Sequence, residues 1–243
     1  MARNKAATVQ PKNSAPGGKR SGRPLRIPTE RTVSPRRHHE APQGGRSLET
    51  YEKLITAAGE LLGEVGFEKL TTNAICARAG LTPPALYRYF HDKYEVLEAV
   101  ARKLLKKQND AFAAWMFQGG TWKDPASRAK ALEEWFRICV GLTTSEPGAL
   151  WTLRALRALP NLAHIRLESQ RQSTDQMFEF YRRIYPNVPA ETLWCRIRVI
   201  AEFGFAVDEL ALEEDRIPHD VLFREAARVL GIPYDYEIGP DRA

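Results

Sequence analysis

The sequence predicts an all-α protein, in which an N-terminal three-helix domain is joined by a long helix to a C-terminal helical bundle. Three observations support this fold class. After residue 47, apolar residues recur at three- and four-residue spacing, as they do on one face of an α-helix. Glycines and prolines stand between these periodic segments, where helices begin and end. Runs in which polar and apolar residues alternate, which would indicate strands, are absent from the sequence.

The composition is that of an ordinary globular protein. The chain has 243 residues, of which 43% are hydrophobic and 27% charged, with a formal net charge of +6. Its apolar runs stay below the roughly 18–20 residues that a membrane span requires. Cys76, Cys139 and Cys195 are odd in number and too far apart for a zinc motif, which favours a reducing compartment. We therefore expect a cytoplasmic protein with no membrane partner.

Residues 1–45 differ from the rest of the chain. They hold ten Lys and Arg against two Glu, so this segment carries +8 and the remaining residues carry −2. Large apolar side chains are scarce and Pro, Gly and Ser are frequent, which predicts a disordered basic arm. Such an arm either only keeps the protein soluble or lies along DNA phosphates. Within it, Ser21-Gly22-Arg23-Pro24 resembles the core of AT-hook peptides, which insert arginine into an A·T minor groove.

Two helices are predicted directly after the arm. The first begins near Ser47, whose hydroxyl is placed to cap it, and ends at Gly66. The second is short and covers residues 72–79, with Thr72 as its cap and Gly80 as its end.

A third helix follows after a tight turn. Thr82 is placed to cap it, and Pro83 occupies its first position, where the missing N–H costs nothing. Leu86 and Phe90 are four residues apart and would share its buried face. Two short helices separated by a glycine turn, behind a longer supporting helix, make a helix-turn-helix unit.

These residues together resemble the N-terminal domain of TetR-type (tetracycline repressor-like) transcriptional regulators. The resemblance covers about residues 47–105. The chain departs from the family at Pro84, where members usually have glycine, and at Cys76, where alanine is more common. The residues that carry the resemblance are Gly66-Phe67, Thr71-Thr72, Ile75, Ala79-Gly80-Leu81-Thr82, Ala85-Leu86-Tyr87-Arg88-Tyr89-Phe90 and Lys93.

The resemblance implies that the third helix enters the major groove of DNA. Arg88 would pair with both acceptors of a guanine or, alternatively, contact a phosphate. Hydroxyl groups would position the protein on the DNA backbone, although Tyr89 would alternatively pack against the first helix. The expected DNA-binding residues are Thr71, Thr72, Thr82, Pro83, Pro84, Ala85, Tyr87, Arg88, Tyr89 and Lys93.

A long helix over about 93–116 comes next, and Asp92 and Glu95 form a capping-box-like pair at its start. Gly119-Gly120 would end it, and further helices are predicted at about 125–143, 147–159, 161–185, 189–213 and 218–230. The predicted organisation is a disordered basic arm (1–45), a helix-turn-helix DNA-binding domain (46–105), a helical regulatory and dimerisation domain (106–232) and a tail (233–243). The resemblance implies that the long helix transmits ligand binding to the DNA-binding domain by tilting.

The last two predicted helices each carry an apolar stripe. The resemblance implies that they pair with those of a second copy in a four-helix bundle. The alternative is that both stripes only complete the core of one chain. The expected dimer-interface residues are Leu193, Ile197, Ile200, Gly204, Val207, Ala211, Val221, Leu222, Ala226 and Val229.

Large side chains on the central helices predict a mostly apolar pocket for a flat or lipophilic molecule. The alternative is that they only fill the core. Arg154, His164, Arg166 and Arg171 would orient an acidic ligand or, equally, form a solvated face. The expected pocket residues are Phe112, Trp115, Met116, Trp135, Trp151, Met177, Phe178, Tyr181 and Phe203.

Sequence motifs for catalysis, metal binding or cofactor binding are missing from the chain. We therefore expect no enzyme and no cofactor. The expected function is that of a homodimeric repressor, which binds a pseudo-palindromic operator in double-stranded DNA and is released by an unknown small-molecule effector. One alternative is an architectural DNA-binding protein in which the basic arm dominates. Another is a small-molecule-binding protein whose helix-turn-helix has decayed.

Overall fold

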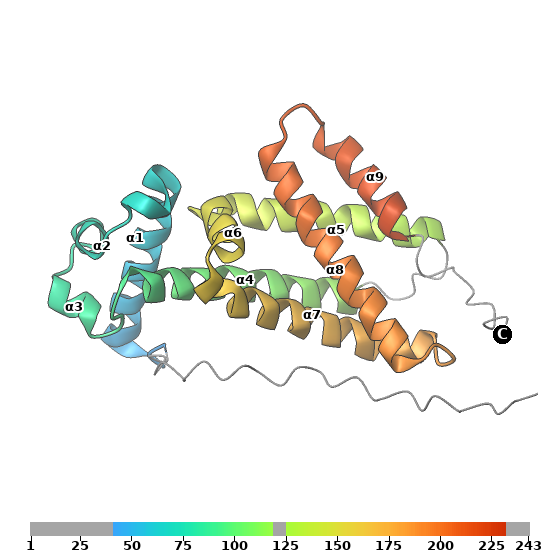
Figure 1. Cartoon of the computed structure of the whole chain (residues 1–243), viewed down its shortest axis with the longest axis horizontal. Helices are drawn as coiled ribbons and strands as arrows, with labels where there is room; N and C mark the ends of the chain where they lie inside the picture. Colours follow the sequence, from blue (N-terminus) through green and yellow to red (C-terminus); the bar gives the residue numbers. More distant parts are fainter. Residues whose placement is uncertain (1–40, 119–124, 232–243) are drawn as a thin grey trace, which may run out of the picture. The chain divides into compact units, whose positions relative to one another are not determined.

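A computed structural model describes residues 41–118 and 125–231, and within these ranges it consists of helices without strands, as the sequence predicts. Figure 1 shows α1, α2 and α3 gathered at one end of the long α4, with α5, α6 and α7 beside the rest of that helix and α9 next to α5. The basic arm up to residue 40, the expected break at Gly119-Gly120 and the terminal tail lie outside the described residues. The helices are α1 (Gly45–Lys69), α2 (Thr72–Ala79), α3 (Pro83–Tyr87), α4 (Lys93–Gln118), α5 (Pro125–Ser145), α6 (Ala149–Ala158), α7 (Ala163–Ile184), α8 (Ala190–Glu213) and α9 (His219–Gly231), with a 3-10 turn, η1 (Pro160–Leu162).

The first helix is longer than predicted at both ends. It already begins at Gly45, so the prediction that Ser47 caps it is wrong. The hydroxyl of Ser47 instead shares a hydrogen bond of 2.9 Å with the hydroxyl of Tyr89. Gly66 has a φ of 74° and kinks the helix rather than ending it, and a last turn continues to Lys69.

The later helix ends lie close to the predicted ones, because glycine and proline mark them. At the start of α4, the backbone N–H groups of Tyr94 and Glu95 donate to Asp92 Oδ1, and Glu95 accepts from the N–H of His91. The predicted capping pair is thereby confirmed. Pro160 begins η1, which joins α6 to α7. None of the described helices is long and apolar enough to cross a membrane.

The N-terminal helices and α6 share one hydrophobic core. Leu54 of α1, Ile75 of α2, Leu86 of α3 and Leu97 of α4 are almost completely buried in it, and Leu156 of α6 joins them. Because α6 belongs to the predicted regulatory domain, the core continues across the boundary expected near residue 105. The division into two domains there stays a prediction.

Two further cores hold the remaining helices together. One lies between α5, α8 and α9 and is centred on Phe136, Phe223 and Leu230. The other lies between the second half of α4, α7 and α8, and contains Phe112 and Ile197. The helix α8 therefore contributes to both cores.

Candidate functional site

The turn between α2 and α3 is fixed by local backbone chemistry. The side chain of Thr71 accepts a hydrogen bond of 3.1 Å from the N–H of Ala74 and so caps α2. The prediction that Thr72 is the cap is wrong by one residue, because Thr71 has the extended backbone of a cap and Thr72 is already helical. Gly80 ends α2 with a φ of 66°, in the left-handed region predicted for it.

The helix α3 has only five residues and is anchored by one of them. Pro83 occupies its first position, as predicted, and Leu86 points into the core with 0% exposure. The carbonyl of Thr82 accepts hydrogen bonds from the N–H groups of Ala85 and Leu86, at 2.9 and 3.4 Å. This anchoring leaves the opposite face of α3 to the solvent.

Most residues expected to contact DNA are exposed, either on that outer face of α3 or in the segments beside it. Thr71, Thr82, Pro83, Pro84, Tyr87 and Arg88 are exposed, and Thr72 and Ala85 are half-buried. Tyr87 is 50% exposed, and its hydroxyl lies 3.2 Å from that of Thr72, which ties α3 to α2. The guanidinium carbon of Arg88 lies 5.8 Å from the centre of the Tyr89 ring.

Tyr89 and Lys93 are placed differently. Tyr89 is 7% exposed, and its ring lies 5.9 Å from the ring of Tyr51 on α1. The structure thus gives it the alternative predicted position, packed against the first helix. Lys93 donates to the carbonyl oxygens of Phe67 and Glu68, at 3.2 and 3.5 Å, and so closes the end of α1. Both were expected at the DNA, and their contacts instead hold the domain together.

Arg78 on α2 is a cation that faces the protein. Its guanidinium lies 2.6 Å from Glu64 and 3.3 Å from Glu60, both on α1. The hydrogen bond from Arg78 lowers the pKa of Glu64 and, in turn, raises the pKa of Arg78. Arg78 therefore clamps α2 to α1, and its charge is compensated within the domain.

A cavity of about 100 Å³ lies between α4, α5, α7 and α8. Its apolar wall contains Phe112, Trp115, Met116, Trp135, Met177 and Tyr181, all of them expected pocket residues. The other three expected residues lie elsewhere. Trp151 covers Gly66 of α1, where a Cβ atom would lie 3.7 Å from its ring, Phe178 supports the core around Phe112, and Phe203 is 56% exposed on α8.

The cavity wall also contains polar residues that the sequence did not predict there. Asp208 of α8 is 4% exposed, and burial raises the pKa of its carboxyl to about 6, although a hydrogen bond from Thr143 opposes the shift. Gln108 of α4 is also buried there. A sequence signal for Asp208 exists, since it stands four residues after Gly204 and three before Ala211, inside an apolar stripe.

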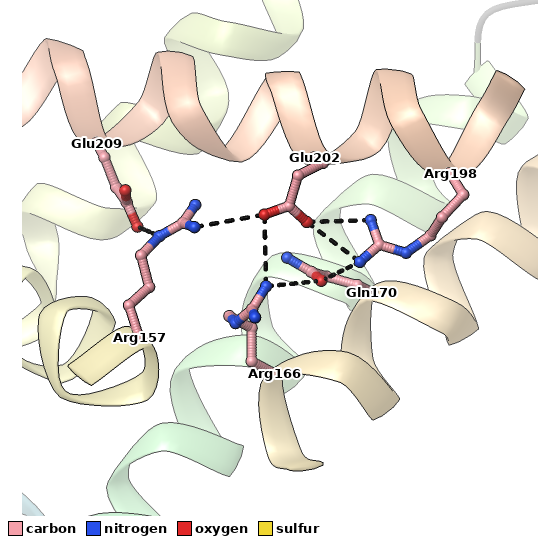
Figure 2. A network of polar contacts seen from close by, with 6 residues as sticks. All are labelled: Arg157, Arg166, Gln170, Arg198, Glu202 and Glu209. Atoms are coloured by element: carbon pink, nitrogen blue, oxygen red, sulfur yellow. Dashed lines mark hydrogen bonds and ion pairs between the residues drawn. The ribbon is translucent and has the colours of Figure 1, made fainter. Parts of the chain in front are cut away.

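A network of ion pairs joins α6, α7 and α8. Figure 2 shows Glu202 of α8 between Arg157 of α6, Arg166 of α7 and Arg198 of α8, at 3.3, 3.4 and 3.1 Å. Arg157 also pairs with Glu209. Burial raises the pKa of Glu202, but the arginines outweigh it and the pKa lies below its usual value.

Two of the arginines expected to orient an acidic ligand are engaged in such pairs. Arg154 of α6 lies 2.9 Å from Glu213 of α8, and Arg166 belongs to the network of Figure 2. His164 lies 3.8 Å from Glu98, and Arg171 is exposed. The structure therefore places these four side chains outside the cavity wall and favours the predicted solvated face.

The residues expected at a dimer interface divide into two groups. Leu193, Ile197, Ala211 and Ala226 are buried within one chain, since they face α7 or α5, and the expectation that a second copy covers them is wrong. Ile200, Gly204, Val207, Val221 and Leu222 are half-buried, and Val229 is 66% exposed. The exposed apolar face of α8 and α9 instead contains Val199, Phe203, Leu210 and Val229.

Comparison with known proteins matches both the sequence of the N-terminal helices and the fold. The family described as "Bacterial regulatory proteins, tetR family" matches residues 54–100. The tetracycline repressor protein class C of Escherichia coli is 44% identical over 54 residues, which are 22% of this chain and 25% of that protein. The transcriptional regulator BetI of Stenotrophomonas maltophilia is 30% identical over 91 residues, 37% of this chain and 45% of that protein. The matched part thus spans less than half the length of these relatives.

Solved structures extend the likeness to most of the chain. A putative TetR-family transcriptional regulator from Mesorhizobium loti has a TM-score of 0.59 at 15% identity, covering 77% of this chain and 96% of the other. The fatty acid degradation regulator FadR from Bacillus halodurans has a TM-score of 0.59 at 15% identity, covering 78% and 96%. At such identities the likeness concerns the fold. The sequence match at residues 54–100 assigns the N-terminal helices to the tetR family of bacterial regulatory proteins, and the rest of the chain shares the fold of such regulators.

Proposed function

We propose that the protein is a homodimeric transcriptional repressor that binds an operator in double-stranded DNA and leaves it when a small molecule occupies the cavity. The observation that carries the proposal is the exposed outer face of α3. Leu86 holds this short helix on the core, so that Pro83, Pro84 and Arg88 all point away from it. The projecting start of this helix is the part of a helix-turn-helix that reaches base edges in the major groove, and because α3 has only five residues, Arg88 directly after it lies close to that start.

Arg88 is the best candidate for base recognition on that face. Its guanidinium is exposed, and the contact with the Tyr89 ring limits its freedom. A held guanidinium can donate to both acceptors of one guanine, which is worth about 1–3 kcal/mol of discrimination. Repression rather than activation is proposed because several matched relatives are named tetracycline repressors.

Dimerisation is proposed through the exposed apolar face of α8 and α9. Phe203 and Val229 are 56% and 66% exposed, and contact of such apolar side chains with water is unfavourable. Both side chains would be buried if this face packed against the same face of a second copy. Two copies would place two α3 helices on half-sites about 34–36 Å apart, one turn of DNA.

The test is selection of binding sites from random duplex DNA with the full-length protein at physiological salt. We expect an enriched inverted repeat, and we expect Arg88→Ala to bind it at least 10-fold more weakly, with relaxed preference at one position of each half-site. Arg78→Ala is the matched control, because it also removes one positive charge from the domain, but from a side chain paired with α1. It should keep the operator preference.

Two outcomes would contradict the proposal. Binding without enrichment of any sequence, lost on deletion of residues 1–40, would mean that the basic arm drives a weakly specific interaction. Absence of DNA binding by a folded, dimeric protein would leave only ligand binding as a function.

A further inference from the structure

The cavity has one polar end, and its hydrogen bonds have a fixed direction. Gln108 Nε2 donates to Thr143 Oγ1 at 2.9 Å, and the Thr143 hydroxyl lies 3.2 Å from Asp208 Oδ2 and 2.9 Å from the carbonyl oxygen of Cys139. The Thr143 hydroxyl has a single proton, and both the Asp208 carboxylate and the Cys139 carbonyl already accept from it. The Gln108 amide must therefore present its nitrogen, which donates, and not its oxygen to this hydroxyl. Gln108 Oε1 and Asp208 Oδ1 then have no hydrogen-bond partner among the described residues. Both atoms are acceptors.

The charge of Asp208 is not balanced within the described part of the chain. Besides burial, the groups that act on its carboxyl are the Thr143 hydroxyl and the like charge of Glu209. The cavity wall does contain one cation, Arg128, at the start of α5. Thr143, which contacts the Asp208 carboxyl, is fifteen residues further along α5, so its backbone lies about 22 Å from that of Arg128 at 1.5 Å per residue.

Three aromatic rings form part of the remaining wall. The ring of Phe112 lies 5.8 Å from that of Trp115 and 5.0 Å from that of Trp135, and the two tryptophans are 5.2 Å apart. Such a surface packs against an apolar body, and the faces of its rings attract a cation. The cavity of about 100 Å³ is of the same order as one of roughly 150 Å³ that holds benzene, so it suits a ligand with no more than one ring.

We propose that the cavity binds a small lipophilic amine in its protonated form, with the ammonium N–H groups donating to Asp208 Oδ1 and Gln108 Oε1. The apolar body of the amine lies against Phe112, Trp115 and Trp135. This inference deepens the proposed function, because it names the class of the effector. The physical reason is that a buried, unpaired carboxylate is costly, and a bound cation removes that cost while a neutral or anionic ligand does not.

The test measures binding of three probes to the full-length protein by calorimetry at pH 7.5, without DNA. The probes share a phenyl ring and differ in their polar end: 2-phenylethylamine, 2-phenylethanol and 3-phenylpropionate. We expect the amine to bind at least 10-fold more tightly than the alcohol, and the carboxylate most weakly. Asp208→Asn should remove the preference for the amine and leave the affinity for the alcohol within about threefold.

Two further variants secure the interpretation. Asp110→Asn is the matched control, since Asp110 is an exposed carboxylate of α4 paired with Lys106, and it should keep the preference. Gln108→Met removes the second acceptor at similar size and should lower amine affinity at least threefold, which keeps the test decisive if Asp208→Asn does not fold.

Three results would overturn the assignment. The first is equal binding of the amine and the alcohol. The second is tighter binding of the carboxylate, which would mean that Arg128 binds an acidic ligand in the cavity. The third is failure of all three probes to bind. Because no DNA is present, these results are independent of the operator selection. A failed amine assignment therefore leaves the DNA-binding proposal standing, and the reverse also holds.

Discussion

Gly148, just before α6, lies directly against Gly59 of α1. A Cβ atom at Gly148 would stand 2.2 Å from the carbonyl oxygen of Gly59, and the φ of Gly148 is +70°. The two backbones therefore touch where a side chain would keep them apart. Trp151 of α6 also covers Gly66 of α1, where a Cβ atom would lie 3.7 Å from the Trp151 ring. The start of α6 is thus docked on α1 by backbone contact and one aromatic ring, in addition to the core that α6 shares with the N-terminal helices.

We predict that Gly148→Ala destabilises the protein by about 2–4 kcal/mol, because the backbone must move and alanine disfavours the left-handed conformation. Chemical denaturation measures this change. Gly141→Ala is the matched control, since Gly141 is within α5 and its Cβ would meet nothing within 4 Å. The control should be neutral or up to about 1 kcal/mol more stable. Equal effects of both substitutions would mean that the close contact is unimportant.

The Tyr89 hydroxyl supplies the second prediction. Tyr89→Phe removes the hydrogen bond to Ser47 and should cost about 0.5–1.5 kcal/mol of stability. Operator affinity, measured where both proteins are fully folded, should change less than threefold. Tyr87→Phe is the comparison, because its hydroxyl lies on the exposed face near Thr72. A larger loss of operator affinity for Tyr89→Phe than for Tyr87→Phe would mean that the Tyr89 hydroxyl contacts DNA.

The positions of the helices along the chain could be predicted from the sequence. Which other helix packs against each apolar helix face could not. Gly80, Pro83 and Pro160 mark ends that local backbone chemistry decides, so the structure confirms them. Trp151 and Phe203 illustrate the limit. Periodicity shows that each lies on an apolar face, but whether α1, the cavity or solvent meets that face depends on tertiary packing.

The polar end of the cavity was missed for a similar reason. A single aspartate in an apolar stripe, such as Asp208, suggests either an exposed edge or a buried function. Only the placement of Thr143 and Gln108, 65 and 100 residues away in sequence, decides between the two. The sequence likewise predicted a DNA contact for Lys93, because it does not show that the Lys93 ammonium donates to a backbone carbonyl at the end of α1.

The raised pKa of Asp208 predicts a pH dependence. The pKa is about 6 in the folded protein against 3.8 ordinarily, so the native state binds the proton more tightly than the unfolded state. Stability from this group is present below about pH 4 and is lost as the pH rises through 6. The loss approaches about 3 kcal/mol for the pKa difference. Asp208→Asn should therefore match the wild type near pH 4 and be more stable at pH 7.5.

Denaturation of both proteins across pH 4–8, without ligand, measures this difference, and subtracting the curves removes the titration of other carboxylates such as Glu202. A difference that stays flat with pH would mean that the carboxyl is paired or hydrated in solution. In that case the cost on which the amine assignment depends would be absent.

The exposed apolar face of α8 and α9 supplies a prediction on assembly. Phe203→Arg should convert the dimer to a monomer at micromolar concentration, because it places two charges in the proposed apolar interface. Sedimentation velocity measures the change. Ile184→Arg is the matched control, as Ile184 is 51% exposed at the end of α7, outside that face. A dimer that survives Phe203→Arg but not Ile184→Arg would place the interface on α7.

A chain of contacts links the cavity to the N-terminal helices, and through it a ligand in the cavity would affect DNA binding. Asp208 faces the cavity, and its neighbour Glu209 pairs with Arg157 of α6. The start of α6 is docked on α1 at Gly148 and Gly59. These contacts form one continuous path from the cavity to the helix-turn-helix. A ligand that shifts α8 would therefore displace α6 and, with it, the DNA-binding helices.

We predict that Arg157→Gln leaves operator affinity and amine affinity, each measured alone, within about threefold of wild type, but lowers their coupling. The coupling is the ratio of amine dissociation constants with and without operator, and it must equal the effect of amine on operator affinity. It should fall at least threefold in Arg157→Gln. Arg182→Gln is the control, since Arg182 pairs with Glu179 within α7. Unchanged coupling in Arg157→Gln would exclude this path and point to α4, which contributes to both the cavity and the N-terminal core.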